Sequence, residues 1–277
     1  MTLFCYQEVE LGLTIMSKLK LNEYEYFFVD MDGVIVRTDQ LVEGAVDSLR
    51  DLRDFGDIFV LSNNSTRTRE KFSNNLAGLG IQVSAHSIIN SAFVLAKYLQ
   101  ETRGSTSAFV VGEEGLDREL ELMGHEVVDP SEAEVIAVGM DRGISYEKLD
   151  GALSALNSGA EFYATNADKT FPTPEGESPG AGASVGAIEG MGFDPDQIVG
   201  KPSSVAAEIA MEVAGTGDPE ECLVIGDRLE TDILMAERAG MDSALVMTGV
   251  ETRESLEASK IEPTYVFENL QELVSSQ

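Results

Sequence analysis

The sequence predicts an α/β protein in which helices cover both faces of a parallel sheet, with a second, smaller domain inserted into the chain. Short apolar runs alternate with segments of helical periodicity along most of the 277 residues, which is typical of buried parallel strands joined by helices. Polar clusters follow several of these runs, and ligands of open parallel sheets bind at the carboxyl ends of strands. The Gly-, Pro- and Ser-rich stretch 169–184 breaks the pattern in the middle of the chain. We expect it to be a long functional loop.

Residues 22–85 and 195–277 are expected to form a discontinuous core domain, because strand-like and helical segments alternate in both. The segments are, in chain order, strand 26–30, helix 43–55, strand 57–62, helix 68–80, helix 202–215, strand 221–227, helix 231–240 and strand 243–249. Residues 86–194 have their own alternation, with strands expected within 107–112, 134–141 and 160–166. This middle segment is therefore predicted to be an inserted cap domain.

The charge balance excludes a nucleic-acid-binding face. The chain has 49 acidic and 19 basic residues, a formal charge of −30, whereas phosphate backbones require clustered Lys and Arg. The acids are spread along the whole chain, which suits a solvated coat in a protein that works at molar salt, where self-repulsion is screened. An ordinary acidic cytosolic protein is the alternative, and we favour the halophilic coat.

Two cysteines, Cys5 and Cys222, exclude a disulfide framework, and His86 and His125 are too few for a histidine-based metal centre. No apolar run reaches the length of a membrane span. The first 17 residues contain two glutamates and no basic residue, so they do not resemble a signal peptide. We expect a cytoplasmic protein. Residues 1–21 are expected to form an N-terminal extension. Two alternatives for it are that the extension is disordered and that translation starts at Met16.

The first polar cluster is Asp30, Asp32 and Gly33, at the end of the apolar run 26–29. Residues two apart in a strand face the same side, so both carboxylates are expected to point at one site. Two adjacent carboxylates repel each other unless a cation lies between them, and such oxygen ligands suit Mg²⁺. Gly33 permits a sharp turn and a close approach of the backbone to a ligand.

Two further clusters are suited to binding phosphate. Ser62, Asn63 and Asn64 follow the run 57–61 just before a helix start, where hydroxyl, amide and backbone N–H groups can surround an anion. Lys201 precedes Pro202, which is expected in the first turn of the next helix. A lysine held at that junction can place its ammonium on a phosphate or on buried carboxylates.

The last cluster lies within 224–233. Asp227 follows an apolar strand, and Thr231 is expected to cap the next helix with Asp232 in its first turn. Asp227 would complete a metal site, supported by Asp232 from behind. Each of the four clusters alone also fits an ordinary role: solvated turn acids, turn residues, a surface lysine or a capped helix. Because all four follow predicted strands, together they indicate a single site.

The four clusters, in this order, resemble the motifs of the haloacid dehalogenase superfamily, and the resemblance covers about residues 24–270. The motifs are Asp-Met-Asp-Gly (30–33), Ser-Asn-Asn-Ser (62–65), Gly-Lys-Pro (200–202) and Gly-Asp-Arg-x-x-Thr-Asp (226–232). Three middle stretches are similar to the cap of subclass IIA, which contains p-nitrophenyl phosphatase-like and pyridoxal phosphatase-like enzymes; they are 139–149, 159–168 and 178–188. The resemblance implies a Rossmann-like core with a C2-type α/β cap. The strongly negative net charge further predicts that the protein comes from a halophilic archaeon.

The resemblance implies a Mg²⁺-dependent phosphatase that hydrolyses a small phosphorylated metabolite, a phosphomonoester, through an aspartyl-phosphate intermediate. Asp30 would attack phosphorus, and Asp32 would protonate the leaving oxygen and then activate water. Mg²⁺ would bind Asp30, the backbone carbonyl of Asp32 and Asp227, with Asp232 behind them.

The resemblance also implies which residues bind the substrate. Ser62, Asn63, Asn64 and Lys201 would bind the phosphoryl group, while the cap residues Asn166 and Asp168, with the loop 180–184, would select the substrate. Alternatives are a phosphotransferase of the same fold and a non-catalytic protein that binds phosphorylated ligands. The second is disfavoured because every expected catalytic position is filled. Expected partners are a small phosphorylated metabolite and a second copy of the chain in a homodimer, with no nucleic acid or membrane.

Overall fold

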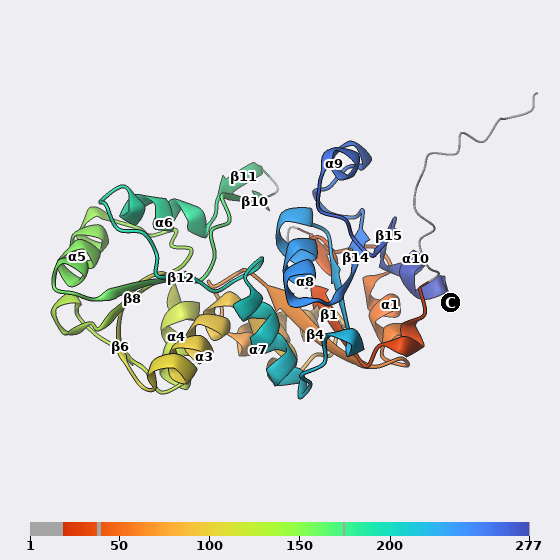
Figure 1. Cartoon of the computed structure of the whole chain (residues 1–277), viewed down its shortest axis with the longest axis horizontal. Helices are drawn as coiled ribbons and strands as arrows, with labels where there is room; N and C mark the ends of the chain where they lie inside the picture. Colours follow the sequence, from red (N-terminus) through yellow and green to blue (C-terminus); the bar gives the residue numbers. More distant parts are fainter. Residues whose placement is uncertain (1–18, 38–39, 174, 277) are drawn as a thin grey trace, which may run out of the picture.

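The computed structural model describes residues 19–37, 40–173 and 175–276, which form two lobes that are each built on a parallel sheet (Figure 1). The first lobe contains the chain ends of the described region, and the second is inserted between them. The predicted α/β architecture with a smaller inserted domain is confirmed. In the described region, no helix has both the length and the apolar composition needed to cross a bilayer.

The first lobe, which we call the core lobe, contains a six-stranded parallel sheet. Its strands, in spatial order, are β15 (Tyr265–Phe267), β14 (Asp242–Val246), β13 (Cys222–Gly226), β1 (Tyr26–Asp30), β4 (Asp57–Ser62) and β5 (Ile88–Asn90). The central strands are buried on both faces, which explains why they occur as continuous apolar runs in the sequence.

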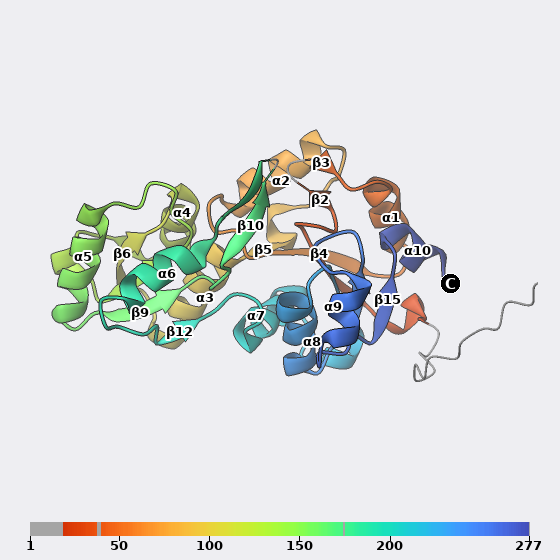
Figure 2. The same ribbon diagram turned by 90° about the horizontal axis from the view of Figure 1, so that it is seen from above.

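Helices cover both faces of this sheet (Figure 2). Phe27 and Phe28 point to opposite faces of β1, as neighbouring side chains in a strand do. Phe27 packs in a cluster with α1 (Ala45–Leu52), α2 (Arg69–Gly78) and α10 (Leu270–Ser275), and Phe28 packs with α3 (Ser91–Arg103), α7 (Ser204–Ala214) and α8 (Leu234–Ala239). Both phenylalanines are fully buried, and burial of each contributes about 1.5–3 kcal/mol to folding.

The second lobe, which we call the cap, contains a five-stranded parallel sheet. Its strands, in spatial order, are β12 (Gln197–Ile198), β9 (Glu161–Ala164), β8 (Val135–Val138), β6 (Ser107–Val111) and β7 (Glu126–Val127). One face packs on α5 (Tyr146–Asn157) and α6 (Ala181–Glu189), and the other packs on α4 (Glu114–Leu122) and on α3.

Helix α3 joins the two lobes, because one apolar cluster continues from Phe28 of the core sheet through Leu95 of α3 to Ala137 of the cap sheet. A buried ion pair adds to this joint. Glu119 of α4 accepts hydrogen bonds from the backbone N–H of Arg69 at 2.8 Å and from its Nε at 3.1 Å, and the guanidinium lies 3.7 Å above the ring of Phe93. Both contacts fix the cap relative to the core lobe.

The domain limits differ slightly from those predicted. Strand β5 lies beyond the predicted limit at residue 85 yet belongs to the core sheet, while β12 lies after residue 194 yet pairs with the cap strand β9. At the N-terminus, Leu19 and Leu21 of the predicted extension 1–21 are buried against the core sheet, since both are large apolar side chains. Residues 1–18 of that extension lie outside the described residues.

Several connections are more regular than predicted. The stretch 169–184 contains the antiparallel hairpin β10 (Thr170–Thr173) and β11 (Gly176–Pro179), followed by the start of α6. A smaller hairpin, β2 (Val36–Arg37) and β3 (Gln40–Leu41), follows β1. Single turns and short helices complete the chain: η1 (Leu21–Glu23), η2 (Ala85–Ser87), η3 (Pro130–Glu132), η4 (Pro219–Glu221), the π-turn η5 (Leu229–Ile233) and α9 (Arg253–Ala258).

Two predicted helix starts were wrong. Helix α7 begins at Ser204 because the Ser203 hydroxyl accepts a hydrogen bond from the backbone N–H of Val205 at 3.3 Å, so Pro202 precedes the helix. Thr231 is not a cap, because it lies inside η5, which continues directly into α8. Helix α2, predicted over 68–80, begins at Arg69, and Thr68 caps it by accepting a hydrogen bond from the N–H of Lys71.

Candidate active site

The four polar clusters meet at the carboxyl edge of the core sheet. Strands β13, β1 and β4 are direct neighbours, so the residues at or just after their ends, Asp227, Asp30 and Ser62, lie side by side. Lys201 reaches the same place from the segment between β12 and α7, and its ammonium contacts Asp30. The single site expected from the sequence therefore exists in the structure.

Lys201 lies between two buried carboxylates. Its Nζ donates to Oδ1 of Asp30 and, at 2.6 Å, to Oδ1 of Asp232. The three residues are 6 %, 5 % and 1 % exposed, respectively. Burial acts to lower the pKa of Lys201, but the two carboxylates outweigh it and raise that pKa above its usual value, so the ammonium stays charged.

The pairing of Asp232 corrects one prediction. Asp232 was expected to support Asp227, yet its side chain is bound to Lys201, and its other oxygen accepts from the N–H of Arg228 at 3.3 Å and from the hydroxyl of Thr231 at 3.2 Å. The π-turn η5 directs the carboxylate this way. Asp232 thus holds the lysine in place opposite Asp30.

Asp227 has one carboxylate oxygen without a partner. Its Oδ2 accepts from the backbone N–H of Val250 at 3.1 Å, whereas the buried Oδ1 has no hydrogen-bond partner among the described residues. Burial and the nearby charge of Asp232 raise the pKa of Asp227 to about 7. Glycine is required beside it, since a Cβ on Gly33 or Gly249 would lie 2.3 Å or 1.5 Å from Oδ2.

These residues fit a divalent cation. Oxygen atoms of Asp30, Asp227 and Asp232 lie within 4.8 Å of one another, and a single ammonium, that of Lys201, opposes three buried carboxylates. Burial raises the pKa of Asp30 well above its usual range, Lys201 opposes this, and the other carboxylates raise it further. Additional positive charge would keep all three ionised, and the unpartnered oxygen of Asp227 offers a ligand for it.

Asp32 lies on the open side of the site, which differs from the expectation that both aspartates face the same way. Strand β1 ends at Asp30 and the chain then turns, with the N–H of Gly33 donating to Val36 O at 2.7 Å. As a result Asp30 is buried and Asp32 is exposed. The Ser62 hydroxyl is 3.5 Å from Oδ2 of Asp32 and accepts from the N–H of Asn64. Asp32 can therefore exchange protons with solvent.

The amide side chains of Asn63 and Asn64 are used within the protein, so the predicted phosphate binding by this loop would rest on Ser62 and on the backbone around Asn63. Asn63 donates to Lys201 O and accepts from Lys201 N, both at 3.0 Å. The Asn64 carbonyl oxygen accepts from the backbone N–H and the hydroxyl of Thr66. These bonds fix the loop after β4 and the position of the lysine. The Ser62 hydroxyl remains directed at Asp32.

Asn166 also has a different place from the one predicted. It is 2 % exposed, and its amide donates to Asn63 O at 2.7 Å while its oxygen accepts from the N–H of Asp168. It connects the cap to the loop after β4 and is not among the residues that line the cavity beside Lys201. Asp168 does face the cavity, where it accepts from Asn63 at 3.0 Å, and burial raises its pKa. Residues 180–184 were expected to form a loop over the site. In the structure they form the N-cap and the first turn of α6.

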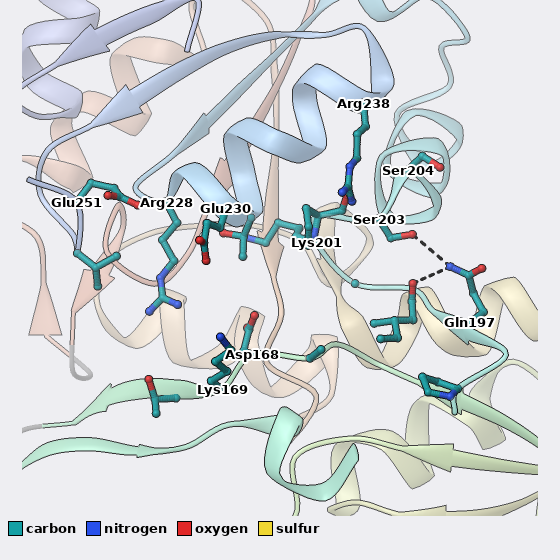
Figure 3. Close-up of a pocket in the computed structure, with 18 of the residues that line it drawn as sticks. Asp168, Lys169, Gln197, Lys201, Ser203, Ser204, Arg228, Glu230, Arg238 and Glu251 are labelled. Atoms are coloured by element: carbon teal, nitrogen blue, oxygen red, sulfur yellow. Dashed lines mark hydrogen bonds between the residues drawn. The ribbon is translucent and has the colours of Figure 1, made fainter. Parts of the chain in front are cut away.

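A cavity of about 770 Å³ lies beside Lys201, between the cap and the core lobe (Figure 3). The core lobe contributes Arg228, Glu230, Thr231 and Glu251 to its wall, and the cap contributes Asp168, Lys169 and Thr170. Most of these residues were not predicted to belong to the site. Two sequence signals pointed to Lys169 and Arg228: Lys169 begins the stretch 169–184 that was expected to be a functional loop, and Arg228 lies within the motif 226–232.

Comparisons with known proteins agree with this geometry. The family model of haloacid dehalogenase-like hydrolases matches residues 27–126, and that of HAD-hydrolase-like proteins matches residues 198–273. The 5'-nucleotidase YutF of Bacillus subtilis is 32 % identical, over 92 % of this chain and 99 % of the relative. The sugar-phosphatase AraL of the same organism is 34 % identical, over 88 % of this chain and 90 % of the relative. Among solved structures, the p-nitrophenyl phosphatase from Archaeoglobus fulgidus is similar, with a TM-score of 0.87 and 35 % identity over 92 % of this chain and 99 % of that one.

Proposed function

Because the chain belongs to subclass IIA of the haloacid dehalogenase-like hydrolases and is a phosphoric monoester hydrolase, we propose that it dephosphorylates a small metabolite through an aspartyl-phosphate on Asp30. The observation that carries this mechanism is the position of Asp30. Its carboxylate lies at the end of the central strand and is held by Lys201, which also lines a cavity of about 770 Å³.

In the first step, an oxygen of Asp30 attacks phosphorus and the bond from phosphorus to the leaving oxygen breaks. Asp32 donates a proton to that oxygen, so the product leaves as an alcohol. In the second step, Asp32 takes a proton from water as the water oxygen attacks phosphorus. The aspartyl bond breaks, and inorganic phosphate and free Asp30 are released. The exposed position of Asp32 next to the Ser62 hydroxyl suits both transfers.

Positive charge near Asp30 reduces the repulsion between a carboxylate and a phosphate ester. Lys201 supplies one such charge from this chain. Mg²⁺ would be held by Asp30 and Asp227, with the backbone carbonyl of Asp32 as a third ligand, and when bound it would supply charge neutralisation at phosphorus. The Asp232 carboxylate, engaged by Lys201, would keep the ammonium directed at Asp30.

A screen for phosphate release from a panel of phosphorylated metabolites, run at high salt with Mg²⁺, tests the proposed function. We expect release from at least one small phosphomonoester and from p-nitrophenyl phosphate. Absence of release from every ester in a correctly folded preparation would contradict the proposal. Transfer of the phosphoryl group to an added polyol, in place of water, would favour the phosphotransferase alternative.

Binding of Mg²⁺ is expected to raise the melting temperature of the wild-type protein. A ligand that binds only the folded state adds about 2.7 kcal/mol at 100 times its Kd. Asp227→Asn removes a charged ligand and should reduce or abolish this shift. Asp54→Asn, at an exposed position after α1, is the matched control and should keep it. Thermal unfolding with Mg²⁺ and with a chelator measures the effect, and equal shifts in both variants would contradict the proposed metal site.

We further propose that the acidic surface is an adaptation to high salt. Of the described acidic side chains, only Asp30, Glu119, Asp141, Asp227 and Asp232 are buried, so most of the 49 acids contribute to a negatively charged surface. Dialysis from molar KCl to dilute buffer lengthens the Debye screening distance from about 3 Å to tens of Å, and we expect loss of helical circular dichroism. An unchanged spectrum would contradict this proposal.

A further inference from the structure

Arg228 and Lys169 line the same cavity from opposite lobes. Arg228 follows Asp227 in the core lobe, and Figure 3 shows its guanidinium directed toward the cap segment that carries Asp168 and Lys169. Lys169 directly precedes the hairpin strand β10. Two side chains of like charge therefore border one space of about 770 Å³.

The other charged groups around this space are mostly engaged. Lys201 is held by Asp30 and Asp232. Asp168 accepts from Asn63, and Arg238 donates to Pro202 O at 2.8 Å.

Two acids of the core lobe lie on the same wall. Glu251 accepts from the N–H of Leu229 at 3.1 Å, while Glu230 is exposed. In the part of the chain that the structure describes, neither Arg228 nor Lys169 forms an ion pair within 4.0 Å. The two cations thus remain available to a ligand.

Most basic residues that the structure describes form ion pairs with the abundant acids, for example Lys148 with Asp141, but Arg228 and Lys169 do not. Two like charges that face one cavity repel each other, and an anion between them relieves the repulsion. Burial raises the pKa of Asp168, while Asn63, Lys201 and Arg228 lower it, so the positive charge of Arg228 extends to the cap side of the cavity. Arginine can also bind a carboxylate or phosphate through two parallel hydrogen bonds.

We propose that Arg228 and Lys169 together bind a second anionic group of the substrate, a carboxylate or a second phosphate. The inference rests on the proposed phosphatase function and narrows its substrate class to small phosphomonoesters that carry a further anion. The reacting phosphoryl group lies at Asp30 and Lys201, and the second anion lies toward the cap. A neutral polyol or nucleoside moiety would leave both cations without a partner.

The test compares substrates that differ only in the second anion. Wild-type protein should have a higher kcat/KM for 3-phosphoglycerate than for glycerol 3-phosphate if the second anion is a carboxylate. If it is a phosphate, fructose 1,6-bisphosphate should be preferred over fructose 6-phosphate. The pair in which the ester with the second anion has the higher kcat/KM identifies that anion as a carboxylate or a phosphate. Assays use the lowest salt at which circular dichroism shows folded protein, because salt screens such contacts.

Arg228→Met and Lys169→Met should each reduce this preference by about tenfold, since a hydrogen bond to a charged group is lost. Glu230→Gln, which removes the exposed acid of the same wall, should preserve or increase it. Arg118→Met, which removes a surface cation paired with Glu121 on α4, is the matched control and should leave it unchanged.

Two results would overturn the proposal. One is a wild-type protein that hydrolyses p-nitrophenyl phosphate but shows no preference within either pair. The other is an Arg228→Met variant whose kcat/KM falls by the same factor for every ester, which would mean that Arg228 contacts the reacting phosphoryl group.

If no ester is hydrolysed at all, the proposed function fails separately. Calorimetry on the Asp30→Asn protein then still tests binding of the second anion by Arg228 and Lys169. Either 3-phosphoglycerate must bind more tightly than glycerol 3-phosphate, or fructose 1,6-bisphosphate must bind more tightly than fructose 6-phosphate, and adding Arg228→Met must remove the difference.

Discussion

Asp30→Asn is expected to lower kcat for p-nitrophenyl phosphate by at least about a thousandfold, the scale seen when a nucleophile is removed from an enzyme. Asparagine keeps the shape of the side chain and an oxygen for the Lys201 ammonium, but the amide cannot form the aspartyl-phosphate. Stability should be unchanged or higher. The substitution removes one of three buried carboxylates, and Asp232 still pairs with Lys201 at 2.6 Å.

The control for this prediction is Asp150→Asn, the same substitution at an exposed position on α5, which should leave kcat unchanged. Circular dichroism and thermal unfolding verify the fold of both variants. Acid quenching of the wild-type reaction should also trap phosphate on the protein, and the Asp30→Asn protein should trap none. An Asp30→Asn activity within tenfold of wild type would disprove nucleophilic attack by this residue.

The sequence predicted the layers of the fold well because buried parallel strands leave a clear apolar pattern. The run that ends at Asp30 became the centre of the core sheet, and residues 107–112 contain a central strand of the cap sheet. Element ends were less predictable. The start of α7 at Ser204 depends on whether Ser203 or Pro202 occupies the cap position, and the hairpin within 169–184 depends on pairing that has no strong local signal.

The site was predictable where function depends on strand ends and less so where it depends on contacts between lobes. Asp30 and Asp227 meet as expected because their positions follow from sheet order, and Lys201 joins Asp30 from the segment between β12 and α7. The amide side chains of Asn63 and Asn166, in contrast, satisfy backbone groups where the cap and the core lobe join, an arrangement that the sequence did not predict. Whether an amide binds a ligand or the protein's own backbone depends on tertiary packing, which single-residue chemistry does not determine.

Lys201→Met is expected to abolish most activity and to lower the free energy of unfolding by about 3–5 kcal/mol, the usual cost of removing one partner of a buried ion pair. Methionine fills a similar volume, so packing changes little. Asp30 and Asp232, both almost fully buried, would then face each other without the ammonium. Denaturant unfolding at the working salt concentration measures the loss. Mg²⁺ should recover part of it, because it can partly neutralise the same carboxylates.

A second substitution separates the structural role of Lys201 from its chemical role. In Lys201→Met/Asp232→Asn, one of the two carboxylates left without the ammonium is replaced by a neutral amide. The double variant should therefore be more stable than Lys201→Met alone. The effects of the two substitutions on stability should be non-additive because the two side chains are in contact. Activity should nevertheless stay low, since no cation from this chain offsets the charge of the phosphoryl group beside Asp30. If stability and activity both return, Lys201 acts only by balancing Asp232. If neither single nor double variant loses stability, the carboxylates are neutralised by another group, and the assignment of Lys201 as their main partner is wrong.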